Sequence, residues 1–236
     1  MNIPDNEKFV LSRSGNWTFD HHVSKIFDAH VRKSIPCYED IQDIIGRISK
    51  RLLNNKDRVC DLGTATGQVI QSIYNTNREK QIQFTGIDES HPMLEEAKFK
   101  CNLIPHTRFL NEKIENHQFD SYELITSVFT LQFIDPPLRQ SILKKIADSL
   151  QPKGYFIFCE KVNYCQECSN TFFISVHEDW KSNHFTAEEI SSKRKSLKNV
   201  MRLFTLEKYI ELLKNARFNQ IEIFFRWCNF VCLLAH

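Results

Sequence analysis

The sequence lacks any apolar run of the roughly 20 residues that a membrane-spanning helix requires. Its first ten residues are polar and have no apolar centre of the kind found in a secretory signal. The eight cysteines do not follow the spacing of a small disulfide scaffold, so we expect reduced thiols. These absences predict a cytoplasmic protein that is not attached to a membrane.

The chain also lacks an excess of charge of one sign, because 31 Lys and Arg face 29 Asp and Glu. A protein that binds several nucleic-acid phosphates usually has a clear basic excess. The densest basic run, from Lys193 to Arg202, is typical of a solvated helix face. We therefore expect a small-molecule substrate and no direct binding of nucleic acid.

No repeat or low-complexity linker divides the 236 residues, which are enough for one full hydrophobic core. We expect a single domain over 1–236, with an N-terminal helical cap at 1–55 and a helical insertion at 165–216. The 19 Phe indicate a large core and a pocket or interface lined with rings.

The order of predicted elements indicates the fold class. Helices are expected at 20–33, capped by Asp20, and at 39–54, after a break at Pro36. Strands at 58–62, 81–88, 107–110, 124–128 and 154–161 then alternate with helices at 67–74, 91–100 and 136–150, and Pro152-Lys153-Gly154 forms the turn that opens the last of these strands. A helical section at about 170–216 and a hairpin within 220–235 follow. This α/β order predicts a Rossmann-like, seven-stranded, mostly parallel sheet with a C-terminal antiparallel hairpin and added N-terminal helices.

A loop of small residues follows the first predicted strand and opens a helix: Asp61-Leu62-Gly63-Thr64-Ala65-Thr66-Gly67. Small residues let a backbone approach a ligand closely. The second strand ends at Asp88-Glu89, where a carboxylate can accept hydrogen bonds from both hydroxyls of a ribose. A dinucleotide site would favour three glycines, and the leading carboxylate would oppose a pyrophosphate. The loop thus predicts S-adenosylmethionine (SAM) rather than NAD, on a class I methyltransferase fold; a purely structural turn is the alternative.

Further short stretches follow the order of one family along nearly the whole chain. They are Trp17-Thr18-Phe19-Asp20, Ser34-Ile35-Pro36-Cys37-Tyr38, Phe129-Thr130-Leu131-Gln132-Phe133, Cys159-Glu160-Lys161, His177-Glu178-Asp179-Trp180-Lys181, Ile190-Ser191-Ser192-Lys193-Arg194, Asn199-Val200-Met201 and Trp227-Cys228-Asn229-Phe230. The segments around Phe129 and Arg194 are not general methyltransferase features. In these stretches the chain resembles the carboxy-S-adenosyl-L-methionine (carboxy-SAM) synthases, which are relatives of the methyltransferases.

This resemblance implies an enzyme that converts SAM and prephenate into carboxy-SAM and phenylpyruvate, through a sulfonium ylide that captures carbon dioxide derived from prephenate. The product would serve modification of the wobble uridine of certain tRNAs. The resemblance also implies a homodimer, with the arginine near or across the subunit interface.

The same resemblance assigns the site residues. Arg194 would bind the added carboxylate, which suits the planar guanidinium, and Arg194 and Tyr38 are the implied catalytic residues. The implied contacts to SAM or carboxy-SAM are Tyr38, Gly63, Thr64, Ala65, Asp88, Glu89, Glu112, Lys113, Val128 and Arg194. Glu112 or Lys113 would flank the adenine.

The chain departs from the family at several of these positions. Cys37 replaces a glycine, Thr64-Ala65 replaces Cys-Ser, Glu112-Lys113 replaces Gly-Asp, and Val128 replaces an asparagine that could bond the cofactor. These changes fit a divergent synthase and also an ordinary SAM-dependent methyltransferase with another small acceptor. A non-catalytic scaffold that keeps the fold is a third interpretation, which the intact loop opposes.

Three other patterns have competing interpretations. Cys165-x-x-Cys168 and Cys228-x-x-x-Cys232 could supply four zinc ligands, but Cys228 and Cys232 lie in an apolar, strand-like run, so we expect no metal. His177 with Asp179 could form a general base pair, although His-Glu-Asp on a helix more often lies at the surface or in a cap. Tyr38, Trp180 and Trp227 are either pocket rings or core packing.

Overall fold

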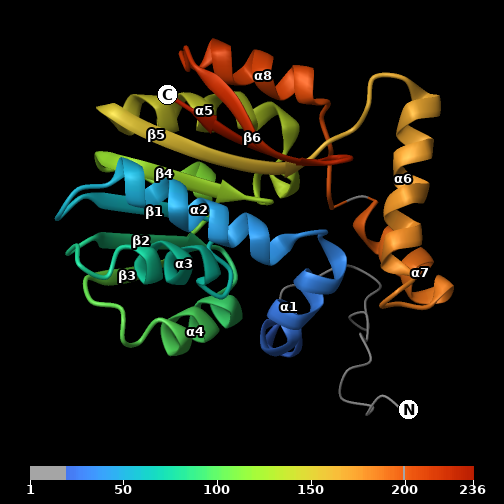
Figure 1. Ribbon diagram of the computed structural model, residues 1–236, viewed down its shortest axis with the longest axis horizontal. Helices are drawn as coiled ribbons and strands as arrows, with labels where there is room; N and C mark the ends of the chain where they lie inside the picture. The colour runs from blue at the N-terminus through green and yellow to red at the C-terminus, as the bar shows by residue number, and fades with distance from the viewer. Residues whose placement is uncertain (1–19, 199) are drawn as a thin grey trace.

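The computed structural model describes residues 20–198 and 200–236. The family-like stretch at Trp17–Phe19 and the residue Asn199 therefore lie outside the described residues. Seven strands form one sheet in the order β3-β2-β1-β4-β5-β7-β6 (Figure 1). They are β1 (Arg58–Leu62), β2 (Gln83–Asp88), β3 (Thr107–Asn111), β4 (Tyr122–Val128), β5 (Leu150–Lys161), β6 (Ile221–Trp227) and β7 (Phe230–Ala235).

The first five strands pair in parallel, whereas β7 is antiparallel to both β5 and β6. The predicted Rossmann-like sheet with a closing hairpin is confirmed. The carboxyl ends of β1, β2 and β4 therefore share one edge, and β1 and β4 are neighbours from different halves of the chain. Such a switch point is where open α/β sheets bind ligands.

Eight α-helices surround the sheet in the described part of the chain (Figure 1). They are α1 (His21–Ser34), α2 (Tyr38–Leu52), α3 (Gln68–Thr76), α4 (His91–Lys100), α5 (Pro136–Ser149), α6 (Glu167–Lys181), α7 (Ala187–Leu197) and α8 (Leu206–Asn215). The expected helical section at 170–216 thus consists of three separate helices. None of the described helices is long and apolar enough to cross a membrane.

Each face of the sheet contributes to its own hydrophobic cluster. Cys60 and Leu62 of β1 join one cluster with α5 and α8, whereas Val59 of the same strand joins the other with α2 and α3. Alternate residues of a strand point to opposite faces, so the sheet is covered on both sides. In Figure 1, α6 and α7 stand beside the sheet rather than over either face, on the side where α1 lies.

Local signals explain most element boundaries. The Asp20 carboxylate accepts hydrogen bonds from the backbone N–H groups of His22 and Val23, both at 3.0 Å, and so caps α1 as predicted. The start of β5 was predicted wrongly. It lies at Leu150 rather than after a turn at Pro152-Lys153-Gly154, because Leu150 already pairs with Tyr122 before the register shifts and Tyr155 pairs with Leu124.

Candidate functional site

The loop after β1 is fixed against the end of β2. The N–H groups of Gly63 and Thr64 both donate to the Ile87 carbonyl, at 2.8 and 2.9 Å. Gly63 has a φ of 68° and Ala65 a φ of 48°, in the left-handed region that favours glycine. The loop is therefore held in one conformation that exposes its small side chains to the space beyond the strands.

Asp88, at the end of β2, accepts from two backbone N–H groups. Ala65 donates to Oδ2 at 2.9 Å and Ser90 donates to Oδ1 at 2.8 Å. Burial raises the pKa of the Asp88 carboxyl, and these two N–H groups oppose the rise. Each carboxylate oxygen keeps a second lone pair, so Asp88 can still accept a ribose hydroxyl. Glu89 beside it is exposed and lies 3.9 Å from the Lys113 Nζ.

Asp61, which precedes the loop, is buried and lies outside the cavity wall. Its Oδ1 accepts a hydrogen bond from the Thr126 hydroxyl at 2.7 Å. Burial raises the pKa of this carboxyl to about 6, and the hydroxyls of Thr126 and Thr64 oppose the rise. Asp61 therefore joins the ends of β1 and β4 beneath the loop rather than reaching a ligand directly.

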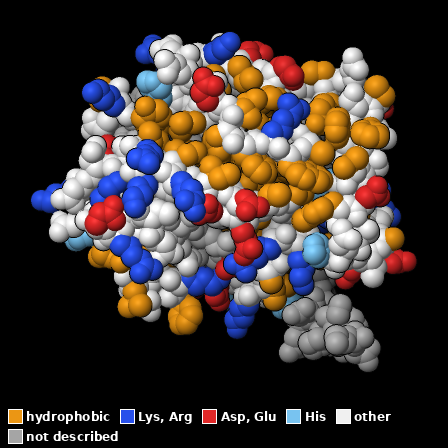
Figure 2. All heavy atoms as spheres, in the orientation of Figure 1, with side chains coloured by type: hydrophobic (Ala, Val, Ile, Leu, Met, Phe, Trp, Pro, Cys, Tyr) orange, Lys and Arg blue, Asp and Glu red, His pale blue; other side chains and the backbone are white. Residues whose placement is uncertain are grey.

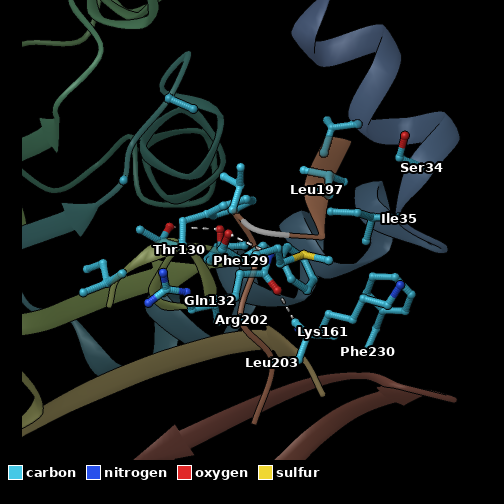
Figure 3. Close-up of a pocket in the computed structure, with 18 of the residues that line it drawn as sticks. Ser34, Ile35, Phe129, Thr130, Gln132, Lys161, Leu197, Arg202, Leu203 and Phe230 are labelled. Carbon is cyan, nitrogen blue, oxygen red and sulfur yellow. Dashed lines mark hydrogen bonds between the residues drawn. The ribbon is translucent and has the colours of Figure 1, made fainter. Parts of the chain in front are cut away.

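A cavity of about 840 Å³ opens at this edge of the sheet. Its volume falls within the roughly 300 to 1,000 Å³ typical of small-molecule sites. Every predicted site residue except Glu112 lies in its wall: Tyr38, Gly63, Thr64, Ala65, Asp88, Glu89, Lys113, Val128 and Arg194. Figure 3 shows how Phe129, Thr130 and Gln132 approach Lys161 and Phe230 from one side, and Ser34, Ile35 and Leu197 from the other.

The side chains of Glu112 and Lys113 lie in different environments. The Glu112 carboxylate contacts the buried His117 at Nδ1, at 2.7 Å, and stays out of the wall. Lys113 and the two following residues, Ile114 and Glu115, line the cavity. The contact with adenine remains a prediction, and Ile114 is a candidate that the sequence did not single out.

Tyr38 begins α2 directly after Cys37, whose φ is 57°. This is the left-handed region, which a glycine adopts without strain. Tyr38 is buried, and its ring centroid lies 6.5 Å from that of Phe129. Burial raises the pKa of its hydroxyl, so the phenol stays neutral. A neutral aromatic ring in the wall suits contact with a nucleoside.

Arg194 reaches the wall from α7. Its Nη1 donates to the Glu178 carboxylate on α6 at 2.9 Å, and 60% of its side chain is exposed. A guanidinium has five N–H donors, so this ion pair leaves others for a ligand carboxylate. The exposure of Arg194 is compatible with a solvated surface cation. Its position in the cavity wall fits the predicted contact with the carboxylate of a ligand.

Comparison with known proteins identifies the family to which the chain belongs. The chain is 33% identical to the carboxy-S-adenosyl-L-methionine synthase of Nautilia profundicola, over 92% of this chain and 93% of that protein. It is 32% identical to that of Actinobacillus succinogenes, over 95% of each. The chain belongs to the carboxy-SAM synthase family. Residues 59–154 also match the family model described as a methyltransferase domain.

Solved structures agree on the fold of this family member. The mitomycin 7-O-methyltransferase MmcR matches with a TM-score of 0.58 and 13% identity, over 83% of this chain and 53% of that one. The YcgJ protein from Bacillus subtilis also matches with a TM-score of 0.58, at 16% identity, over 78% of this chain and 70% of that one. At these identities the likeness supports the fold alone.

His177 is neither at the surface nor paired with Asp179 in this member of the family. It is buried on α6, where its Nε2 lies 2.9 Å from the Ser34 carbonyl and its Nδ1 lies 3.3 Å from the Lys161 Nζ. Burial, followed by the nearby lysines, lowers the pKa of His177 to about 2, so the imidazole is neutral. Both ring nitrogens of the neutral imidazole have a partner, so His177 fixes the positions of Ser34 and Lys161.

Trp180 and Trp227 pack against each other at 6.1 Å between ring centroids, outside the cavity wall. Of the three rings considered from the sequence, only Tyr38 lines the cavity. Among the described residues no group of His, Cys, Asp or Glu is arranged to hold a metal. Cys232 is buried in β7, but Cys228 lies in the turn before that strand and is partly exposed, contrary to its predicted place in the strand.

Three lysines of the cavity wall were not predicted as site residues from the sequence: Lys161, Lys181 and Lys193. A signal for Lys161 was present, because it ends a buried strand whose carboxyl end faces the site. Lys181 and Lys193 lie on separate helices with weak apolar patterns, so only the packing of α6 and α7 against α1 brings them together.

We expect Gly63→Ala to lower SAM affinity at least about tenfold, because φ at this position disfavours a side chain and the new Cβ would meet Thr130 Cγ2 at 2.3 Å. The loop would have to move away from Thr130 and out of its present conformation. Calorimetric titration with SAM measures the effect. Gly154→Ala is the control, since Gly154 lies outside the wall, and wild-type affinity in Gly63→Ala would contradict the assignment of the loop.

Proposed function

We propose that this chain is a carboxy-SAM synthase that converts SAM and prephenate into carboxy-SAM, with release of phenylpyruvate. The observation that carries the proposal is that Arg194 and the loop at Gly63 line one continuous cavity. A cation suited to a carboxylate thus shares a compartment with a loop suited to an adenosyl group. Membership of the synthase family supports the same reaction.

The residues present fit SAM. The small side chains of Gly63 and Ala65 leave space over the ends of the strands, while Asp88 and Glu89 can accept the ribose hydroxyls. Tyr38 offers an aromatic surface within the same wall. Val128 offers only methyl groups, so any polar contact that an asparagine would make there must come from a neighbour.

In the proposed reaction prephenate loses carbon dioxide and hydroxide and becomes aromatic phenylpyruvate. The sulfonium methyl group gives one proton to the hydroxide, which forms water, and its carbon forms a new bond to carbon dioxide. Arg194 would hold the resulting carboxylate by charge-assisted hydrogen bonds. The apolar wall, which includes Val128, Phe129 and Phe230, would exclude bulk water from the carbanion.

We further propose that the enzyme is a cytoplasmic homodimer whose product serves modification of the wobble uridine of tRNA. Figure 2 shows apolar side chains gathered across the centre of one face and towards α6, with charged side chains more frequent around them. Phe172 on α6 and Ile223 on β6 are among the exposed apolar residues, at 60% and 47%. A contiguous apolar area of this kind supports an interface between subunits.

The test is to incubate the purified protein with SAM and prephenate and to follow both products by mass spectrometry. We expect carboxy-SAM and phenylpyruvate in equal amounts, and carboxy-SAM among the small molecules that co-purify with the protein. Methylated acceptor with S-adenosylhomocysteine, and no carboxy-SAM, would instead identify an ordinary methyltransferase. A protein that binds no SAM would indicate a scaffold.

A further inference from the structure

Three lysines from three separate elements meet in the cavity wall. Lys161 ends β5, Lys181 ends α6 and Lys193 lies in α7. In Figure 3, Lys161 lies beside Phe230, across the pocket from Thr130. Lys161 is therefore on the side of the cavity away from Thr130, which packs against Gly63, and Lys181 and Lys193 lie near Lys161. A second molecule beside SAM would lie on that side.

Neutral groups hold the Lys161 side chain in place. His177 Nε2 must carry a proton, because its partner at 2.9 Å, the Ser34 carbonyl, can only accept. His177 Nδ1 is then an acceptor, and the Lys161 ammonium donates to it at 3.3 Å. The Lys161 Nζ also lies 5.3 Å from the centroid of the Phe230 ring. These contacts orient the ammonium group without neutralising its charge.

Among the residues that the structure describes, no carboxylate forms an ion pair with Lys161 or Lys181. The nearest carboxylate, Glu178, pairs with Arg194 at 2.9 Å. Within residues 20–198 and 200–236, neither Lys161 nor Lys181 has a carboxylate within the 4.0 Å of an ion pair. Lys193 lies beside them and donates to the Ser34 hydroxyl at 2.8 Å, and burial lowers its pKa well below the ordinary value of a lysine. Such a half-buried group of like charges is costly unless an anion joins it.

We propose that Lys161 and Lys181, with Lys193 beside them, bind one carboxylate of the co-substrate. This inference rests on the proposed function, in which the co-substrate is the dianion prephenate. One carboxylate would be neutralised by the lysines while the other faces the sulfonium. The cluster would therefore select a small dicarboxylic acid over a neutral acceptor.

The charge of Lys161 makes this binding sensitive to pH. Burial, and next the charge of Lys181, lowers the pKa of Lys161 to about 8. Below that pH the ammonium binds an anion, and above it the neutral amine does not. The titratable groups that interact with Lys161 are His177, Glu178 and Lys181 of α6 and Lys193 of α7. Arg194 of α7 lies near Lys181, and His30 of α1 lies near Lys181 and Lys193. Burial lowers the pKa of both histidines to about 2, so only the lysines change charge in the alkaline range.

The experiment compares Lys161→Met and Lys181→Met with Lys195→Met, an exposed lysine of α7 outside the wall. Prephenate binding is titrated into protein saturated with S-adenosylhomocysteine, which has no methyl group to react. We expect Lys161→Met and Lys181→Met each to weaken prephenate binding at least about tenfold, as for a lost charge-assisted hydrogen bond. SAM affinity should change less than about threefold in all three variants.

The wild-type affinity for prephenate should fall as the pH rises through about 8, and this decline should be smaller in Lys161→Met, where only Lys181 and Lys193 still lose charge. Unchanged prephenate binding in Lys161→Met and Lys181→Met would overturn the proposal. An equal loss of SAM affinity would also overturn it, because the lysines would then hold the amino-acid carboxylate of SAM. Lysine-dependent prephenate binding without formation of carboxy-SAM would support this inference and refute the proposed reaction, so the two failures can be told apart.

Discussion

Arg194→Ala should lose at least about tenfold in affinity for carboxy-SAM, and up to about 100-fold, while its affinity for SAM changes little. A charge-assisted hydrogen bond contributes about 1.5–3 kcal/mol, and the two ligands differ only in the added carboxylate. The exposure of Arg194 places the expected effect toward the lower end of that range, because solvent screens the interaction. Competitive titration of both ligands against the same protein measures the difference.

Two controls separate the ligand role of Arg194 from its ion pair. Glu178→Gln removes the carboxylate that contacts Arg194 Nη1 and should keep or strengthen carboxy-SAM binding. Arg194→Lys should restore only part of the affinity, because an ammonium cannot bind a carboxylate through two parallel N–H groups. Equal losses for SAM and carboxy-SAM in Arg194→Ala, or no loss for either, would rule out the proposed role.

Arg139→Met should lower the free energy of unfolding by about 3–5 kcal/mol, the usual effect of removing one partner from a buried charged network. Arg139 is fully buried on α5 and donates to the carbonyls of Gln132 and Ile134 and to the Tyr209 hydroxyl. Tyr209 in turn donates to the buried Glu160. Burial raises the pKa of Glu160 to about 8 and Arg139 opposes the rise, so the variant leaves this carboxyl without its cation.

Urea unfolding followed by circular dichroism measures the loss. Lys144→Met is the matched control on the same helix, because Lys144 is exposed and should change stability by less than about 0.5 kcal/mol. Arg139→Met with Glu160→Leu should be less unstable than the sum of the two single variants, since the two residues belong to one network. A loss below about 1 kcal/mol in Arg139→Met would show that the network is not required.

The sheet could be predicted from sequence because its signals are local. Apolar residues follow the spacing of strands and helices, small residues mark the loop, and caps such as Asp20 mark the start of a helix. Each of these patterns predicts one kind of local structure. The start of β5 could not be predicted in this way. Pro152 and Gly154 are typical of a turn, and only the pairing of Leu150 with Tyr122 on another strand keeps them in the strand.

The candidate site was predictable where one strand end carries the residues, as at Gly63 and Asp88. It was not predictable where tertiary packing decides the environment. His177 and Asp179 are neighbours in sequence, yet His177 turns inwards to Ser34 and Lys161, which are far from it in the chain. The resemblance to the family supplied Arg194, which residue patterns alone would have assigned to a solvated helix face.

Ser34, at the end of α1, contacts two helices at once. Its carbonyl accepts from His177 of α6, and its hydroxyl accepts from Lys193 of α7, although the two donors belong to different helices. Any displacement of the end of α1 breaks both links together. One residue at the end of α1 thus helps to set the positions of α6 and α7, the two helices that contribute Lys181 and Arg194 to the cavity wall.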